Sequence, residues 1–277
     1  MKELNCFIVT YNEEKRIKDF LLHATQWADN IYMFDKSSTD ETVNIAKQFG
    51  KRVTVCSIEF SPQGWESPAK LLKSHCKDWC FIATPGDIPT RSAVLEVRKI
   101  IQREGSDAID AICLPRKTYS FNEHIANGPW GISYVPCVVN TSSEQLSNDV
   151  HRVVTGSAKL EKIDYSEATH VLHQTHRSVR HFLETHSFYA LKAAQEDSDK
   201  ALRESTRALR NLRTFIRWGK YRGRQYHAWR MYQHATRLAA LEKELREDIA
   251  SSYQERANEY ILNHWNLDDE GRQHRKE

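Results

Sequence analysis

Carboxylate, hydroxyl and amide side chains follow three apolar runs of strand length. Thr10-Tyr11-Asn12-Glu13-Glu14 follows the first run, the segment Asp35 to Thr42 follows the second, and Thr84-Pro85-Gly86-Asp87 follows the third. In an open α/β sheet, ligands bind in the crevice outside the carboxyl ends of the strands. Carboxylates and hydroxyls gathered at such an edge suit a phosphate, a nucleotide or a hard cation.

The stretch from Trp79 to Thr90 is the one around which the others are arranged. Its apolar half, 79–83, predicts a buried strand in the middle of a sheet, which stops at a Pro-Gly turn and presents Asp87. One interpretation is a cation or phosphate site at the strand end. The other is a turn in which Asp87 caps the next helix. The stretch alone leaves both open.

The elements that must position these residues alternate between strand and helix through the first hundred residues. Apolar runs at 4–10, 31–34, 52–56 and 79–83 predict strands, and Asn12 is a good N-cap for the helix after the first of them. This alternation favours a mostly parallel sheet flanked by helices. Strand-like runs at 108–115 and 132–140 have no helix between them, which indicates an antiparallel extension. From Ser178 onward the pattern is helical almost to the end.

The composition is that of an ordinary globular protein. The chain has 277 residues, of which 40% are hydrophobic and 28% are charged. It contains no apolar run of about 18 residues that would predict a membrane-spanning helix. The amino-terminal residues enter a strand directly and lack a signal-peptide pattern. We therefore expect a cytoplasmic location, with peripheral contact to the inner face of a membrane as an open alternative.

The positive charge is concentrated in residues 200–240. This segment holds eleven Lys or Arg residues and one acid, a net charge of +10, so the rest of the chain carries −7. The arginines from Arg203 to Arg217 follow helical steps of three and four and share one face. A solvated helix face is one interpretation. The alternatives are a surface for anionic lipid or for nucleic acid, which makes a polyanionic partner the expectation.

The first two strand ends, in this order and at this spacing, resemble those of the family 2 glycosyltransferases of the GT-A fold. In that family the first strand ends in Thr-Tyr-Asn-Glu and the second in Asp-x-x-Ser-x-Asp-x-Thr, as they do here at Thr10 and Asp35. The short soluble enzymes that add sugars to the lipopolysaccharide core are the most similar in character. The resemblance covers roughly residues 3–190. It implies a catalytic domain over 1–190 and a basic, amphipathic helical extension over 191–277.

The resemblance also implies which residues hold a nucleotide-diphosphate sugar. Tyr11 and Glu14 would flank the nucleoside, and Asp35 would hydrogen-bond the base. Asp40 and Thr42 would stabilise the loop and the following helix. The full expected donor site is Thr10, Tyr11, Asn12, Glu14, Asp35, Thr84, Gly86 and Asp87.

The third strand end departs from the family pattern. Thr84 and Gly86 stand where the family has the two aspartates of its metal-binding Asp-x-Asp motif, and Asp87 takes the place of the following glutamate. Three outcomes are open. Asp87 still reaches a divalent cation (Mn²⁺ or Mg²⁺), with His173 as a second ligand. Alternatively, a Lys or Arg replaces the metal, or the chain is a non-catalytic relative that binds nucleotide sugars.

An inverting transfer needs a general base near the acceptor hydroxyl. Asp149 is the first candidate and Glu123 the second. We expect a sugar to move to a hydroxyl of a bacterial surface glycan such as a lipopolysaccharide core. The alternative acceptor is a hydroxymethylated base in DNA. The expected acceptor-binding residues are Arg217, Lys220, Arg222, Arg224 and Trp229.

Overall fold

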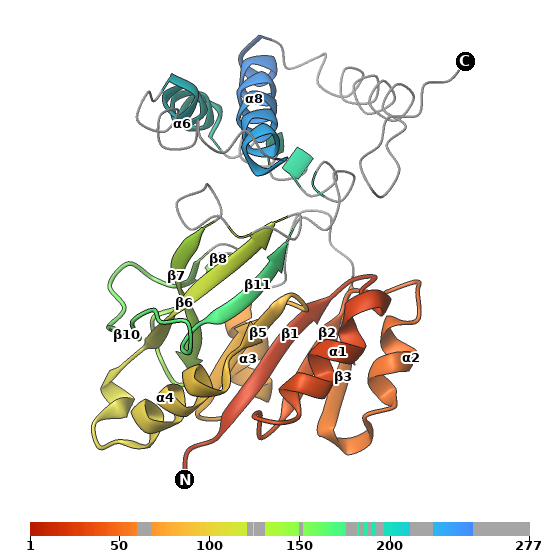
Figure 1. The fold of residues 1–277 in the computed structure, drawn as a ribbon, viewed down its shortest axis with the longest axis vertical. Coiled ribbons are helices and arrows are strands. Elements are labelled where there is room, and N and C mark those ends of the chain that lie inside the picture. The colour runs from red at the N-terminus through yellow and green to blue at the C-terminus, as the bar shows by residue number, and fades with distance from the viewer. Residues whose placement is uncertain are drawn as a thin grey trace. The chain divides into compact units, whose positions relative to one another are not determined.

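The structure, a computed structural model, describes most of the chain (Figure 1). The described residues are 1–59, 68–120, 124, 131–149, 152–175, 182, 186–187, 190–191, 197–210 and 224–245. The strands are β1 (Leu4–Thr10), β2 (Ile31–Asp35), β3 (Val53–Ser57), β4 (Trp79–Ala83), β5 (Asp87–Pro89), β6 (Ala111–Ser120), β7 (Ile132–Asn140), β8 (Leu146–Asp149), β9 (Arg152–Val154), β10 (Leu160–Lys162) and β11 (Val171–Thr175). The α-helices are α1 (Glu14–Ala24), α2 (Thr42–Lys47), α3 (Pro68–His75), α4 (Arg91–Gln102), α6 (Ser198–Arg210) and α8 (Arg224–Leu245), and short 3-10 turns lie at Gly50–Arg52 and Ser106–Ala108.

The main sheet has the strand order β3-β2-β1-β4-β7-β6-β11-β5, and β10 pairs with β6. The first four strands are parallel, whereas β7 is antiparallel to both β4 and β6. The predicted α/β class, the central position of the strand from Trp79 and the antiparallel extension are therefore confirmed. Because β1, β2 and β4 are parallel neighbours, their polar carboxyl ends lie along one edge.

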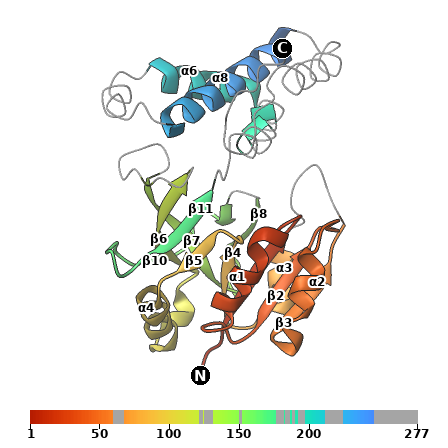
Figure 2. The same ribbon diagram turned by 45° about the vertical axis from the view of Figure 1, so that its right-hand side comes forward.

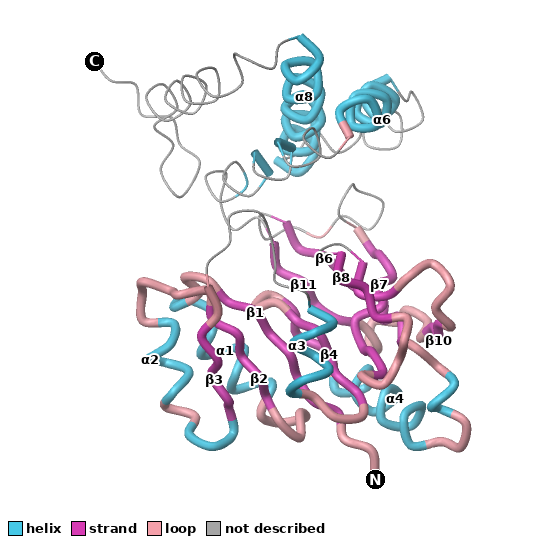
Figure 3. Tube along the Cα trace, turned by 180° about the vertical axis from the view of Figure 1, so that it is seen from behind, coloured by secondary structure: helices cyan, strands magenta, loops and turns pink. Residues whose placement is uncertain are grey.

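Both faces of the sheet are covered, because residues along each central strand alternate between two cores. Cys6 and Ile8 of β1 pack in the core that includes residues of α1 and α4. Phe7 and Val9 pack in the core that includes Leu72 of α3. Figure 2 shows α1 in front of the parallel strands, and Figure 3 shows α3 on the opposite face. Helices on both faces leave the strand ends as the part of the parallel half open to a ligand.

The chain divides into two compact units. Residues 1–117 and 132–173 form the first, and residues 118–131 and 174–277 form the second. The expected division at residue 190 falls inside the second unit. Within that unit α6 packs on α8 through Ala201 and Ala240. No helix in the described part of the chain is long and apolar enough to cross a membrane.

Candidate functional site

The ends of β1 and β2 are tied together by a buried carboxylate. Thr10 and Asp35 lie side by side in the parallel register, and the Thr10 hydroxyl donates to Asp35 Oδ1 at 3.1 Å. Ser38 donates to the same carboxylate twice, from its hydroxyl at 2.6 Å and from its backbone N–H at 2.8 Å. Thr10 and Asp35 are 1% and 2% exposed. Two predicted site residues are thus brought together at the sheet edge.

Asn12 connects the two loops that follow these strands. Its backbone N–H donates to the Ser38 hydroxyl at 2.9 Å, and its side-chain oxygen accepts the Thr39 N–H at 2.9 Å. The backbone of Asn12 is in the left-handed region, with φ of 52°. Asn tolerates this conformation better than most residues. The N-cap prediction for Asn12 is wrong: α1 is preceded by Glu13 without a side-chain cap, and the Asn12 amide is engaged across the gap between the loops.

Asp40 and Thr42 hold the start of α1, whereas the resemblance implied a role in their own loop and in the helix that follows it. Thr42 is fully buried, and its hydroxyl accepts the Glu13 N–H at 2.7 Å and donates to Asp40 Oδ1 at 2.5 Å. Asp40 Oδ2 accepts the Glu14 N–H at 3.1 Å. Partial burial would raise the pKa of Asp40, but the hydrogen bonds from Thr42 and Glu14 outweigh it and lower the pKa. The second motif therefore fixes the backbone from which Tyr11 and Glu14 project.

The turn after β4 is closed by the carboxylate of Asp87. Asp87 Oδ2 accepts the backbone N–H and the hydroxyl of Thr84, each at 2.8 Å. Asp87 is 1% exposed. Asp87 does not cap the next helix, because Thr90 does so by accepting the Ala93 N–H. Of the two interpretations of this stretch, the helix-cap one is excluded.

Two nitrogen-bearing side chains from distant segments, an imidazole and a guanidinium, meet Asp87. His173 of β11 lies opposite Asp87 in the antiparallel pairing with β5, and the His173 Nδ1 is 2.8 Å from Asp87 Oδ1. Arg116 of β6 places its Nε 3.4 Å from the same oxygen. The sequence reasoning selected His173 but missed Arg116. No local spacing signals it, since Arg116 reaches Asp87 only because β11 lies between β6 and β5 (Figure 1).

The charge state of Asp87 follows from these neighbours. Burial of the carboxyl would raise its pKa, but the Arg116 charge, the His173 hydrogen bond and the Thr84 N–H together lower the pKa well below its ordinary value. Asp87 is therefore a carboxylate, which only accepts hydrogen bonds. It follows that His173 Nδ1 carries the hydrogen in this contact.

The arrangement around Asp87 does not fit a divalent cation. Asp87 Oδ2 faces two donors of Thr84, and Oδ1 faces His173 and Arg116. His173 presents its hydrogen-bearing Nδ1 to the carboxylate, and Arg116 would repel a metal ion. Among the described residues, no group of three or more His, Cys, Asp or Glu side chains lies close enough to hold a metal. The expectation that Asp87 and His173 share a cation stays a prediction, and the donor set does not favour it.

Some of the remaining predicted site residues are described by the structure, and the others are not. Tyr11 and Glu14 are exposed at the β1 end, and Gly86 is buried in the turn before Asp87. Asp149 ends β8 and Arg224 begins α8, without a described side chain, and Trp229 is half-buried on α8. Those that lie outside the described residues are Glu123, Arg217, Lys220 and Arg222.

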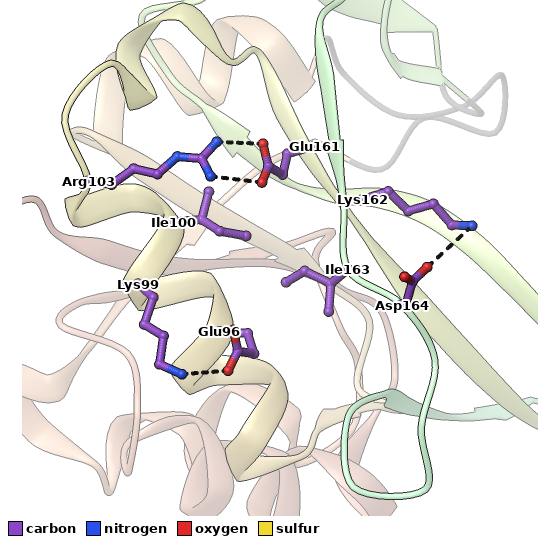
Figure 4. Close-up of a pocket in the computed structure, with 8 residues that line it drawn as sticks. All are labelled: Glu96, Lys99, Ile100, Arg103, Glu161, Lys162, Ile163 and Asp164. Atoms are coloured by element: carbon purple, nitrogen blue, oxygen red, sulfur yellow. Dashed lines mark hydrogen bonds and ion pairs between the residues drawn. The ribbon is translucent and has the colours of Figure 1, made fainter.

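A surface groove lies between α4 and β10, and its charged side chains differ from those at the sheet edge in being paired with one another (Figure 4). Its charged side chains pair with one another: Arg103 with Glu161 at 2.6 Å, Lys99 with Glu96 at 2.7 Å, and Lys162 with Asp164 at 3.8 Å. This groove offers no unmatched charge to a ligand, in contrast to the edge at β1, β2 and β4.

Sequence comparison agrees with the motifs at that edge. Residues 6–65 match the model of the family described as Glycosyl transferase family 2. The matched residues contain the whole of the Thr10–Asp35–Thr42 arrangement. An uncharacterized glycosyltransferase of Rickettsia typhi is 42% identical over 55 residues, and one of Rickettsia prowazekii is 40% identical over 55 residues. Each match covers 20% of this chain and 19% of the relative, so the chain matches about a fifth of the length of these relatives.

Solved structures with weak overall likeness accompany the family 2 match. TarS residues 1–349 of S. aureus, in complex with UDP-GlcNAc, has a TM-score of 0.46 at 12% identity, covering 91% of this chain and 92% of that one. Glucosyl-3-phosphoglycerate synthase from Mycobacterium tuberculosis, in complex with Mn²⁺, UDP and glucosyl-3-phosphoglycerate, has a TM-score of 0.40 at 12% identity, covering 70% and 78%.

Proposed function

We propose that the protein is an inverting glycosyltransferase that moves a sugar from a nucleotide-diphosphate sugar to a hydroxyl acceptor. The observation that carries this proposal is the buried Thr10–Asp35–Ser38 cluster, at the paired ends of β1 and β2, inside the residues that match the family 2 model. Such a cluster at the carboxyl edge of a parallel sheet is the usual place for a nucleotide in an α/β protein.

The donor half of the proposal uses the residues around that cluster. Tyr11 is 43% exposed, so its ring is accessible for stacking against a nucleoside. Glu14 is exposed beside it, and its carboxylate accepts the Glu41 N–H at 3.3 Å. Among the described residues, Asp35 Oδ2 accepts one hydrogen bond, from the Ser38 N–H, which leaves acceptor capacity for a donor group of the base. These features support nucleoside binding between the two loops.

In the transfer step the acceptor oxygen attacks the anomeric carbon while the bond from that carbon to the diphosphate oxygen breaks. The leaving nucleoside diphosphate keeps the electron pair, and a general base takes the acceptor proton. Asp149 and Glu123 remain the proposed candidates for this base. Both belong to the stretch of chain between the end of β6 and the start of β9.

Titration calorimetry of the full chain with UDP- and GDP-sugars tests the donor half. The proposal expects at least one of these sugars to bind and to be transferred or slowly hydrolysed. If no nucleotide sugar bound, with or without Mn²⁺, the proposed function would be overturned.

The acceptor is proposed to be a surface glycan of the lipopolysaccharide-core type, with a hydroxymethylated base of DNA as the second candidate. The net charge of +10 in residues 200–240 favours an anionic acceptor in both cases. Transfer assays with a lipid-linked glycan and with hydroxymethylated DNA, each over a range of salt concentrations, separate them. A DNA affinity that falls steeply with salt, together with sugar transfer to that DNA, would favour the second.

A further inference from the structure

Arg116 is a half-buried cation whose hydrogen-bonding capacity is largely unused. A guanidinium has five N–H donors. In the part of the chain that the structure describes, its one ion pair is from Nε to Asp87 Oδ1, at 3.4 Å, and its side chain is 22% exposed. Both terminal NH₂ groups therefore remain available to a ligand.

Asp87 keeps this guanidinium in place at the edge where the donor is proposed to bind. β6 runs parallel to β4, because each is antiparallel to β7. Arg116 pairs with Ser133, beyond the last β4–β7 pair at Phe81 and Val138, and so lies on the carboxyl side of β4. Asp87 follows β4 on that same side. Thr84 and His173 fix the carboxylate, and the carboxylate orients Nε of Arg116.

We propose that Arg116 binds the diphosphate of the donor through its terminal NH₂ groups and takes the place that a divalent cation would otherwise have. The inference rests on the proposed function and identifies how the same site handles the leaving group. Guanidinium binds phosphate oxygens in a bidentate way, which an ammonium group does not reproduce.

The chemistry of the site gives Arg116 this role because the carboxylates that would hold a metal are absent. Thr84 and Gly86 supply none, and the oxygens of Asp87 already face Thr84, His173 and Arg116. When the bond from the anomeric carbon to the diphosphate oxygen breaks, the electron pair and its negative charge move to the diphosphate. A fixed guanidinium there stabilises that charge without a metal.

The experiment is calorimetric titration of the full chain with UDP and with uridine, and in parallel with GDP and guanosine, in the presence of EDTA. We expect the wild-type protein to bind the diphosphate of the preferred nucleoside at least about tenfold more tightly than the bare nucleoside. Arg116→Gln should lose about tenfold to a hundredfold of the diphosphate affinity and leave the nucleoside affinity within about twofold. The diphosphate affinity of Arg116→Lys should lie between those of the wild-type protein and Arg116→Gln.

Arg98→Gln is the matched control. Arg98 is also a half-buried arginine paired with an aspartate, at 3.1 Å from Asp29, but Asp29 accepts the N–H of Leu4 at the start of β1. This variant should bind both ligands as the wild type does. Thermal melting of every variant separates a folding defect from a binding defect, and Arg116→Lys keeps the test decisive if the Gln variant does not fold.

Three results would overturn the inference. The diphosphate could bind only after Mn²⁺ or Mg²⁺ is added, Arg116→Gln could leave its affinity unchanged, or that variant could weaken uridine and UDP equally. If the wild-type protein bound neither nucleoside nor diphosphate under any condition, the proposed function itself would fail, and this inference with it.

Discussion

Asp87 and His173 are 86 residues apart in the chain, yet they lie opposite each other on β5 and β11 and share a hydrogen bond of 2.8 Å. This contact joins the turn after β4 to β11, which is the last strand in chain order among the described residues. Arg116 approaches the same oxygen, so Asp87, His173 and Arg116 form a small polar network. Asp87 is only 1% exposed, and bulk water therefore does not reach its carboxylate.

Asp87→Asn should destabilise the protein in a pH-dependent manner. The folded pKa of Asp87 lies below the ordinary value of about 3.9, so the ionised group contributes stability above that value and loses it as the pH falls toward the folded pKa. We expect the variant to lose about 1.5–3 kcal/mol at pH 7 and the difference to shrink below about pH 4. Urea denaturation at a series of pH values measures this.

Asp107→Asn is the control for that series. Asp107 is a largely exposed aspartate paired with Lys2, so its substitution should have little effect at any pH. A difference between wild type and Asp87→Asn that stayed constant down to pH 2 would contradict the expected ionisation of Asp87.

Asp35→Asn should weaken nucleoside binding. The carboxylate accepts from the Thr10 hydroxyl and from two groups of Ser38, and an amide would turn an NH₂ group toward at least one of these donors. We expect uridine or guanosine affinity, whichever the wild type shows, to fall at least about tenfold. Asp110→Asn is matched to it, because Asp110 also accepts from a serine hydroxyl and a backbone N–H but precedes the start of β6. Equal loss in both variants would argue against a ligand role for Asp35.

Thr42→Val should cost about 1–3 kcal/mol of unfolding free energy. Valine has nearly the same shape, but it leaves the Glu13 N–H without its acceptor and Asp40 without its 2.5 Å donor. Thr42→Ser keeps the hydroxyl and should cost less. Chemical denaturation of the two variants gives the comparison. A serine variant as unstable as the valine variant would show that the methyl group, not the hydroxyl, matters at this position.

Cys56 should be the first thiol to react with a disulfide reagent in the native protein. All six cysteines are free, and Cys56 is half-buried while the other five are buried. Burial raises the pKa of Cys137 to about 12, which removes its reactive thiolate at neutral pH. Thiol titration should therefore show one early equivalent, absent in Cys56→Ser and present in Cys137→Ser. Several early equivalents in the wild type would contradict the packing described for the strands.

Local patterns predicted most of the sheet because they depend on neighbouring residues. The apolar run from Trp79 to Ala83 corresponds to β4 residue by residue. The role of Asn12 was harder to predict, since asparagine suits both an N-cap and a left-handed backbone. Only the nearby loop with Ser38 and Thr39 decides between them.

The contact between Arg116 and Asp87 could not be predicted from the spacing of residues in the sequence. Arg116 lies within a strand predicted only to Pro115, and its meeting with Asp87 depends on the order β6-β11-β5. Strand order at long sequence separation is set by the packing of the whole sheet. For this reason the altered Asp-x-Asp motif pointed to a missing metal ligand but not to the arginine beside it.

The pairing of β5 with β11 also sets the order in which this edge of the protein can be completed during synthesis. A chain leaves the ribosome from its amino terminus, and early segments begin to fold first. Strands β1 to β4 and the Asp35 loop precede β11, which begins at Val171. A nascent chain that stops before β11 therefore carries the nucleoside-facing half of the site, while Asp87 still lacks His173. Because β11 is the last strand among the described residues, the contact between Asp87 and His173 can form only after the other described strands have been synthesised.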